Sequence, residues 1–254
     1  MAKRSPKLPL STRVKEKIRR TVLIIKGISS VVQRGLGILF GNLPVFLPLA
    51  IAMGLMLAVI DTWVYEWLVP QGATTSAQMQ QSAFIKLMFG WWGAMLALEI
   101  VAGPIVVGMT VYTARAHSHG GKPTLYKAFN FALARYSRIF KWHAIAWLTI
   151  QVGMIVLVPG ILFLLQYAFV DSILCLEDEK WPLARSTKLT RGRRIRIFAI
   201  VFGWLVVNQV VGFLELGFVE KGLGALTGLM GGIYLLNIFV MICFYLFYED
   251  RTTP

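Results

Sequence analysis

The most constraining feature of this sequence is a succession of long apolar stretches. A helix needs about 20 consecutive apolar residues to cross a bilayer, because lipid offers no partner for an unpaired backbone N–H or C=O group. Stretches that approach this length lie at residues 39–63, 84–113, 139–158, 161–176, 197–217 and 226–247. With 57% hydrophobic and 15% charged residues, the chain falls outside the range of ordinary soluble domains. The sequence therefore predicts six membrane-spanning helices.

The positive charges indicate how these helices are oriented. Of the 26 Lys and Arg residues, only Lys86 and Lys221 fall on one side of the predicted membrane. Cytoplasmic segments of membrane proteins carry an excess of Lys and Arg. We therefore expect both termini in the cytoplasm. The basic N-terminus lacks the short apolar core and cleavage site of a signal peptide, so we expect it to be retained.

Part of the sequence is repeated at an offset of 58 positions. Residues 122–140 and 180–198 each begin with a proline in the first turn of a basic amphipathic segment and then enter an apolar stretch. The identical pairs are Lys122/Lys180, Leu125/Leu183, Arg135/Arg193, Arg138/Arg196, Ile139/Ile197 and Phe140/Phe198. Residues 11–35 resemble a more distant third copy. We infer a unit in which an interfacial helix precedes a transmembrane hairpin.

The repeat leads to a specific fold prediction. We expect an all-α integral membrane protein with six transmembrane helices as three hairpins, each preceded by a cytoplasmic amphipathic helix. Residues 1–38 are expected to form the basic N-terminal helix, residues 39–248 the transmembrane domain, and residues 249–254 a cytoplasmic tail. In one hairpin, the pair Pro159-Gly160 is expected to turn the chain.

The basic segments beside the spans are candidates for lipid binding. A Lys or Arg close to an anionic membrane surface contributes about 1 kcal/mol to binding. The alternative is that these charges only set the orientation of the spans. The candidate ligands of lipid headgroups are Arg135, Arg138, Lys141, Arg185, Arg191, Arg193, Arg194 and Arg196.

One stretch resembles a known family. Its pattern consists of Pro159-Gly160, Asp171, the acidic run 177–179, and a helix with Ala184, Ser186, Leu189 and Gly192. This pattern resembles the membrane domain associated with bacterial glycerophosphodiester phosphodiesterases and related uncharacterised multi-span membrane proteins. In that family the catalytic domain is a separate soluble barrel, for which this chain has no room. The resemblance therefore implies a non-enzymatic protein of the bacterial cytoplasmic (inner) membrane.

Two acidic residues lie inside predicted spans. Glu99 is in the middle of its span, where a charge costs about 2.5 kcal/mol or more. It is either a proton or substrate site or a neutral acid hydrogen-bonded to a neighbouring helix. Asp171 lies nearer the cytoplasmic end, and we expect it to pair with an interfacial arginine such as Arg135, Arg138, Arg193 or Arg196.

The remaining polar residues indicate no further chemistry. His117 and His119 lack a third metal ligand nearby, and His143, just inside its span, is expected to snorkel or to bond a backbone carbonyl. We predict no metal, cofactor or nucleic-acid partner. Glycines at 224, 228 and 232 have the spacing of a helix contact, either internal or in a homo-oligomer.

The sequence thus predicts a non-enzymatic multi-pass membrane protein. It is expected to bind anionic phospholipid at its cytoplasmic face and to support a protein partner or membrane homeostasis. The alternative is a small transporter or channel in which Glu99 is the protonatable group.

Overall fold

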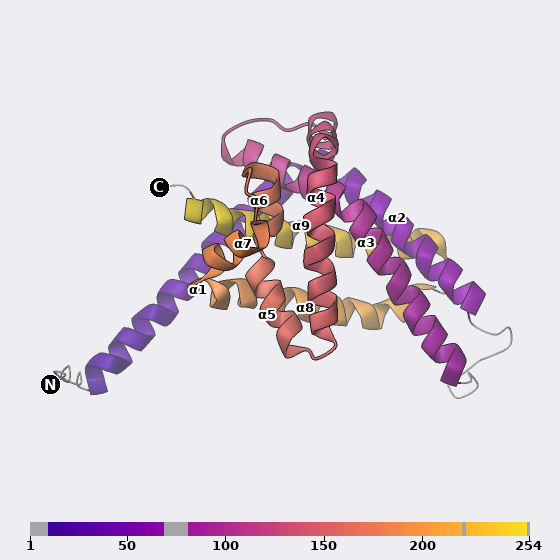
Figure 1. The fold of residues 1–254 in the computed structure, drawn as a ribbon, viewed down its shortest axis with the longest axis horizontal. Helices are drawn as coiled ribbons and strands as arrows, with labels where there is room; N and C mark the ends of the chain where they lie inside the picture. The colour runs from indigo at the N-terminus through magenta and orange to yellow at the C-terminus, as the bar shows by residue number, and fades with distance from the viewer. Residues whose placement is uncertain (1–9, 69–80, 220–221, 253–254) are drawn as a thin grey trace.

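The computed structural model describes residues 10–68, 81–219 and 222–252. These residues form helices joined by short turns and loops (Figure 1). The helices are α1 (Leu10–Gly41), α2 (Leu43–Leu68), α3 (Gln81–Ser118), α4 (Leu125–Met154), α5 (Val158–Tyr167), α6 (Val170–Leu176), α7 (Pro182–Thr190), α8 (Arg194–Val219) and α9 (Leu223–Thr252). The prediction of an all-α fold is confirmed for this part of the chain.

Five segments of the described residues are long and apolar enough to cross a membrane. They are Thr21–Gly41, Leu43–Trp63, Trp92–Ser118, Val158–Leu176 and Leu223–Thr252. The protein is thus a multi-pass membrane protein by helix length and hydropathy. The predicted arrangement of six spans in three equivalent hairpins is wrong. The predicted first span, 39–63, begins too early, since the chain breaks at Asn42 and α2 starts at Leu43.

The two repeated segments fold differently. Most of the first copy and residues 139–154 of the predicted span 139–158 form one uninterrupted helix, α4, so no separate interfacial helix precedes the span. In the second copy, α7 ends at Thr190 and α8 begins at Arg194. Gly192 in this turn has a φ of +87°, a conformation that favours glycine. Ala134 occupies the corresponding position in the first copy and continues the helix. The two copies thus differ in backbone conformation at this position, where the second copy has a glycine.

The hairpin of α4 and α5 turns earlier than predicted. Residues 155–157 make the turn, and Pro159 lies in the first turn of α5, a position that proline favours. The two helices approach closely at a pair of glycines, because a Cβ atom on Gly153 would lie 2.9 Å from the Cα of Gly160. Pro159 and Gly160 therefore lie in the first turn of α5 and not in the predicted turn between the helices, and Gly160 allows α5 to pack closely against α4.

Helix α1 is continuous across residue 38, where the interfacial segment was expected to end. It diverges from α2 at Asn42, and the two helices form an inverted V (Figure 1). Its partners are α9 and α8, since Gly35 lies against Phe239 and Cys243 of α9, and Gly27 lies against the guanidinium of Arg196 of α8. Residues 1–9 of the predicted N-terminal segment lie outside the described residues.

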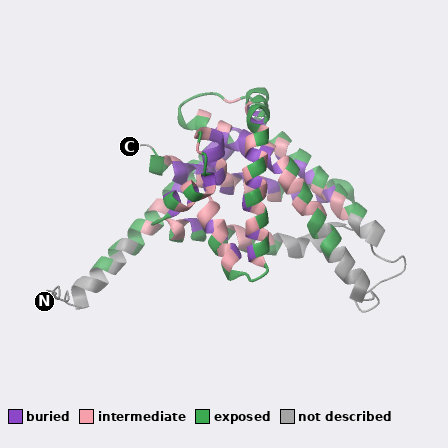
Figure 2. Cartoon of the chain, viewed as in Figure 1, coloured by how far each residue is buried: buried purple, intermediate pink, exposed green. Residues whose placement is uncertain are grey.

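The main buried core lies where α1, α2, α3, α4, α6, α8 and α9 meet (Figure 2). Helices α2 and α9 are in backbone contact, because a Cβ atom on Gly54 would lie 2.5 Å from the backbone nitrogen of Gly231. This contact uses Gly231, whereas Cβ atoms at Gly224, Gly228 and Gly232 would have no neighbour within 4 Å. The predicted glycine spacing in α9 thus points away from its internal partner.

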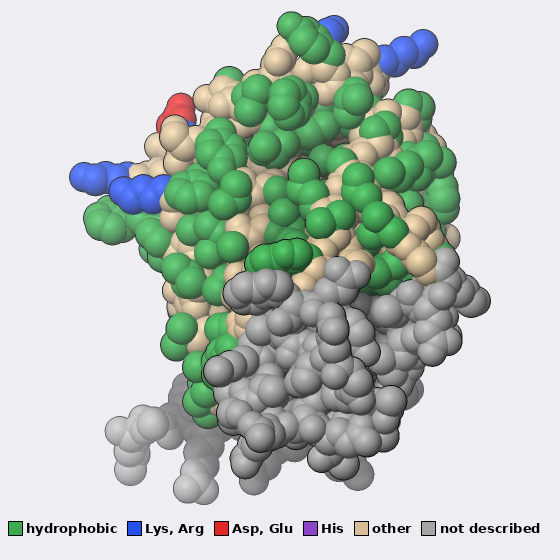
Figure 3. Space-filling model, turned by 90° about the vertical axis from the view of Figure 1, so that its right-hand side faces the viewer, with side chains coloured by type: hydrophobic (Ala, Val, Ile, Leu, Met, Phe, Trp, Pro, Cys, Tyr) green, Lys and Arg blue, Asp and Glu red, His purple; other side chains and the backbone are tan. Residues whose placement is uncertain are grey.

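The outer surface is largely apolar. Figure 3 shows hydrophobic side chains over most of the described part of one face, with Lys and Arg at its margins. Phe40, Leu55, Val101, Val152 and Phe202 are among the large apolar residues that are more than two-fifths exposed. Such exposure is unusual for a soluble monomer and is typical of a surface in contact with lipid.

Candidate functional site

Glu99 forms a helix-to-helix hydrogen bond within the bundle. The hydroxyl of Tyr234 in α9 donates to Glu99 Oε2 in α3 at 2.9 Å. This is the contact with a neighbouring helix that was one of the two interpretations of Glu99. A hydrogen bond of this kind stabilises a membrane bundle by about 0.6 kcal/mol on average, which is small beside the cost of a buried carboxylate.

The other oxygen of Glu99 lies near a histidine. A Cβ atom on Gly103, one turn further along α3, would lie 2.9 Å from His143 Nε2 and 3.5 Å from Glu99 Oε1. Both groups therefore border the space that Gly103 leaves by having no side chain. His143 reaches this point from α4, and its side chain is only 3% exposed.

The opposite side of the same ring contacts the second intramembrane acid. His143 Nδ1 lies 3.0 Å from Asp171 Oδ1 in α6. When Asp171 is a carboxylate, which only accepts hydrogen bonds, Nδ1 is the donor. Nε2 then carries the lone pair of a neutral ring or the second proton of a charged one. This atom is buried and has no hydrogen-bond partner among the described residues.

This geometry differs from the expectations for both residues. Asp171 was expected to pair with an interfacial arginine, but its partner is His143. His143 was expected to snorkel, but it is buried between Asp171 and the position facing Glu99. Four helices thus contribute a polar chain of Tyr234, Glu99, His143 and Asp171, which we name the intramembrane polar chain.

The apolar stretch that contains Asp171 is broken next to it. Helix α5 ends at Tyr167 and α6 begins at Val170, so the predicted span 161–176 consists of two helices. Ser186 of α7 bridges the break, because its hydroxyl donates to the Gln166 carbonyl at 2.7 Å and accepts from the Phe169 N–H at 3.2 Å. Broken helices inside membranes need such partners for the freed backbone groups, and they occur at the binding sites of transporters.

A small cavity lies at this break. It has a volume of about 10 Å³ and is lined by Asp171, Ser172 and Ala168 together with residues of α3 and α9. That volume is close to the minimum that holds one water molecule. The side chain of Asp171 is 33% exposed. The Asp171 end of the intramembrane polar chain is therefore the more open one.

Three of the predicted lipid-binding arginines, Arg138, Arg185 and Arg193, are bound by other groups of the protein. Arg138 binds the Asp178 carboxylate and the Glu177 carbonyl. Arg185 binds the Glu177 carboxylate at 3.1 Å, and this hydrogen bond raises the pKa of Arg185 above its ordinary value. The Glu177 carboxylate also accepts from the Tyr248 hydroxyl at 2.8 Å. These contacts connect α4, α6, α7 and α9 at one end of the bundle.

Arg193 binds the last turns of α9. Its guanidinium donates to the carbonyls of Phe247 at 2.9 Å and Asp250 at 3.0 Å. Cations interact favourably with the carbonyls and the dipole at a helix C-terminus. Partial burial lowers the pKa of Arg193 below its ordinary value, although an arginine keeps its charge at neutral pH. Arg193 is thus a structural link between α8 and α9.

The other five cationic candidates have different surroundings. Arg135 and Lys141 are exposed and lie over aromatic rings, at 4.2 Å from the Phe131 centroid and 5.6 Å from the Trp142 centroid. Arg191 is exposed in the turn before α8. Arg196 lies against α1, and the Nε atom of Arg194 is buried without a hydrogen-bond partner among the described residues.

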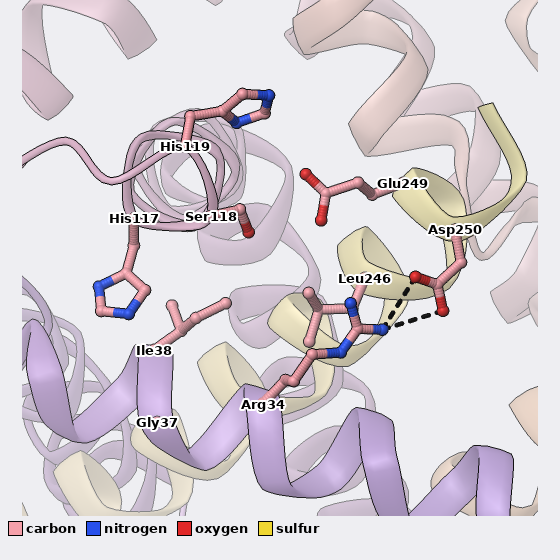
Figure 4. Close-up of a pocket in the computed structure, with 9 residues that line it drawn as sticks. All are labelled: Arg34, Gly37, Ile38, His117, Ser118, His119, Leu246, Glu249 and Asp250. Carbon is pink, nitrogen blue, oxygen red and sulfur yellow. Dashed lines mark hydrogen bonds and ion pairs between the residues drawn. The ribbon is translucent and has the colours of Figure 1, made fainter. Parts of the chain in front are cut away.

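A larger cavity opens between α1, α3 and α9. Its volume is about 640 Å³, and its lining residues are Arg34, Gly37, Ile38, His117, Ser118, His119, Leu246, Glu249 and Asp250 (Figure 4). Arg34 binds both carboxylate oxygens of Asp250 at 2.9 Å. His117 and His119, for which the sequence indicated no metal site, thus line a cavity at the end of α3.

The described residues contain no group of three or more His, Cys, Asp or Glu side chains that could hold a metal ion. In comparisons with known proteins, no family, no curated protein and no solved structure matches this chain. The resemblance to the phosphodiesterase-associated membrane domain therefore stays a prediction.

Two residues of the intramembrane polar chain were missed as site residues. Tyr234 is a tyrosine in an apolar stretch and resembles an ordinary core or interface residue in sequence. His143 is two residues from Lys141, so it was placed at the membrane interface. The available signal was the presence of an ionisable or hydroxyl-bearing side chain inside each of four apolar stretches, since polar groups inside a bundle need partners from other helices.

Proposed function

We propose that this multi-pass membrane protein is a small transporter or channel that moves protons through Glu99, His143 and Asp171. The observation that carries the proposal is the position of His143, whose ring bonds Asp171 at one nitrogen and directs the other, unpartnered nitrogen to the space beside Glu99. Imidazole accepts a proton at one nitrogen and releases one from the other, so it can connect two carboxyl groups.

The unpartnered nitrogen argues against a purely structural polar cluster. Buried polar groups in proteins are nearly always hydrogen-bonded, and a structural network loses stability when one member is unsatisfied. The intramembrane polar chain satisfies Glu99 Oε2 and Asp171 Oδ1 but leaves His143 Nε2 without a partner. This arrangement is explained if His143 Nε2 gains and loses a hydrogen-bond partner as the ring takes up and releases a proton.

The break between α5 and α6 supports the same proposal. Asp171 lies in the first turn of α6, so its position depends on a seven-residue helix that is joined to α5 through Ser186. A short helix on a broken span can move separately from the rest of the bundle. Alternating access in transporters uses such discontinuous helices.

Proton flux into proteoliposomes tests this proposal. Vesicles loaded with a pH-sensitive dye are given an inside-negative potential with a potassium gradient and valinomycin. We expect acidification with the wild-type chain, loss of flux in Glu99→Gln, and strongly reduced flux in His143→Gln. Asp178→Asn, which changes an exposed carboxylate outside the chain of polar residues, is the matched control. Wild-type flux equal to that of empty vesicles, or unchanged flux in Glu99→Gln, would overturn the proposal.

Infrared spectroscopy keeps the proposal testable if a variant folds poorly. A neutral carboxylic acid absorbs at a higher frequency than a carboxylate. We expect the wild-type protein to show a protonated-carboxyl band that changes with pH and is lost in Glu99→Gln. A band with no pH response would contradict proton exchange at this residue.

A second proposed function is the binding of anionic phospholipid at the cytoplasmic rim. It rests on Arg135, Lys141 and Arg191, which are exposed, and on Trp142 and Trp181, whose rings pack edge to face beside Lys141. Tryptophan and lysine together are typical of the headgroup region. We also propose that the protein catalyses no bond-breaking reaction and lies in the bacterial inner membrane. We propose further that it binds a protein partner or forms a homo-oligomer.

Native mass spectrometry in mild detergent tests lipid binding. We expect the wild-type protein to retain phosphatidylglycerol, and a variant with Arg135, Lys141 and Arg191 all changed to Gln to lose most of it. The control variant carries Arg138→Gln, whose cation is held by Glu177 and Asp178. Equal retention by the wild-type protein and the triple variant would contradict this second function.

A further inference from the structure

We propose that the 640 Å³ cavity between α1, α3 and α9 binds a zwitterionic ligand that carries a phosphate ester and a primary ammonium group. This chemistry occurs in ethanolamine phospholipid headgroups and in free phosphoethanolamine. The inference is independent of the proposed proton pathway, because none of the cavity-lining residues belongs to the intramembrane polar chain.

The phosphate would bind on the side of α1 and His117. Arg34 uses one terminal nitrogen, NH2, for both oxygens of Asp250, so its NH1 and Nε groups stay available as donors. The Arg34 side chain is 43% exposed. Arginine is well suited to phosphate, because its planar group presents several N–H donors.

His117 adds a second hydrogen-bond donor to this side. The amide nitrogen of Asn42 lies 2.9 Å from His117 Nδ1. Since the same amide nitrogen donates to the Ile38 carbonyl at 2.7 Å, it is a donor, and Nδ1 must accept. In a neutral ring the proton is then on Nε2. Asn42, at the break between α1 and α2, thus sets the tautomer that can donate to a phosphate oxygen.

The ammonium would bind on the side of α9. Glu249 Oε1 accepts from the Tyr245 hydroxyl at 2.6 Å, and the second carboxylate oxygen is available for a further donor. Figure 4 shows the Glu249 carboxylate and the Ser118 hydroxyl pointing toward one another across the cavity, apart from the Arg34–Asp250 pair. An ammonium group donates three hydrogen bonds, which fits this arrangement of acceptors.

The floor and size of the cavity fit the rest of such a ligand. Ile38, Gly37 and Leu246 supply an apolar surface against which a short methylene linker can pack. The volume lies within the range of about 300–1,000 Å³ found for small-molecule sites. Phe40, one turn along α1 from Gly37, is 64% exposed, so the cavity adjoins a surface suited to lipid chains.

The charges of the lining disfavour two other ligand classes. A divalent cation would need three or four converging ligands, and no such group exists among the described residues. A nucleotide or an inorganic polyphosphate would bring several negative charges next to Glu249 and Asp250, where like charges repel. A ligand with one charge of each sign suits both sides of the cavity.

Histidine modification tests the proposal on the unaltered chain. Diethylpyrocarbonate reacts with accessible imidazoles, and His117 and His119 are exposed whereas His143 is buried. We expect free phosphoethanolamine to protect His117, with His143 unmodified throughout as the internal control. Protein in nanodiscs of phosphatidylethanolamine is expected to be protected without added ligand, and protein in phosphatidylglycerol nanodiscs is not. The proposal would be overturned if His117 reacted equally with and without free phosphoethanolamine and equally in the two kinds of nanodisc.

Two substitutions test the two ends of the ligand. Loss of a charged hydrogen-bond partner lowers affinity by about tenfold or more. We expect Glu249→Gln and Arg34→Gln each to reduce retained phosphatidylethanolamine in native mass spectra by that factor, while Asp178→Asn, at an exposed carboxylate outside the cavity, leaves it unchanged. Retention that depends on Arg34 alone would mean a site for phosphate only and would overturn the zwitterion assignment. Protection by free phosphoethanolamine but not by the lipid would support the same chemistry from a soluble source.

Discussion

The Nδ1 atom of His143 lies 3.0 Å from Oδ1 of Asp171, and this contact joins α4, the long helix that contains most of the first repeat copy, to the short helix α6. It fixes the orientation of the imidazole ring, so the second ring nitrogen faces α3 at Gly103. The absence of a side chain at residue 103 is therefore a condition for the intramembrane polar chain.

Gly103→Ala is expected to displace His143. The added Cβ atom would lie 2.9 Å from His143 Nε2, closer than carbon and nitrogen tolerate without movement. Overpacking in a core costs about 1–3 kcal/mol, although rotation of the ring can relieve part of it. We expect a lower thermal unfolding midpoint in detergent and a reduced proton flux.

Gly93→Ala is the matched control in the same helix. A Cβ atom there would have no neighbour within 4 Å, and alanine is favoured over glycine in helices by up to about 1 kcal/mol. We expect an unchanged or higher midpoint and unchanged flux. If both variants behave alike, Gly103 does not serve to accommodate His143.

Much of the helical content follows from the apolar stretches of the sequence, whereas the breaks do not. Every predicted span lies within or overlaps a helix, because about 20 apolar residues have few alternatives in lipid. The break at Phe169 has no glycine or proline, and it depends on Ser186, which is 17 residues away in the sequence. A contact of this kind arises from tertiary structure, so the local pattern cannot reveal it.

The residues of the intramembrane polar chain were likewise only partly predictable from the sequence. Glu99 and Asp171 were recognisable because a charge in an apolar stretch is costly. Their partners, Tyr234 and His143, come from helices whose neighbours the sequence does not specify. The repeat suggested equivalent units, but the chain turns at Gly192 and stays helical at the corresponding Ala134.

Ser186→Ala is expected to destabilise the break between α5 and α6. The substitution leaves the Phe169 N–H and the Gln166 carbonyl without their partner. A buried polar group without a hydrogen bond costs about 1–3 kcal/mol. We expect a lower unfolding midpoint, together with faster amide hydrogen exchange at Phe169.

The neighbouring residue supplies the control for Ser186. Thr187 donates to the Leu183 carbonyl of its own helix at 3.0 Å, and this carbonyl is also within the helical hydrogen-bond pattern. Thr187→Ala is therefore expected to change the midpoint much less. Slow exchange at Phe169 in the Ser186→Ala variant would contradict the bridging role of the serine.

Gly54→Ala is expected to separate α2 from α9. The new Cβ atom would lie 2.5 Å from the Gly231 nitrogen and 2.8 Å from the Thr227 carbonyl oxygen, and backbone atoms cannot move aside as a side chain can. We expect a loss of about 1–3 kcal/mol in unfolding free energy, measured by denaturation with sodium dodecyl sulfate. Gly228→Ala, which meets no atom within 4 Å, is expected to have no such effect. A comparable loss in both variants would mean that helix contact at Gly54 is not the cause.

Gly192→Ala tests whether one glycine separates the two repeat copies. Gly192 has a φ of +87°, and an alanine in a left-handed conformation costs about 1–2 kcal/mol. The strain would favour continuation of α7 into α8, as in α4, and would withdraw Arg193 from the Phe247 and Asp250 carbonyls. We therefore expect a lower midpoint and faster amide exchange in the last turn of α9. Gly203→Ala, within α8 and open to space, is expected to leave both unchanged. An unaltered exchange rate at the end of α9 would show that the turn at Gly192 does not position Arg193.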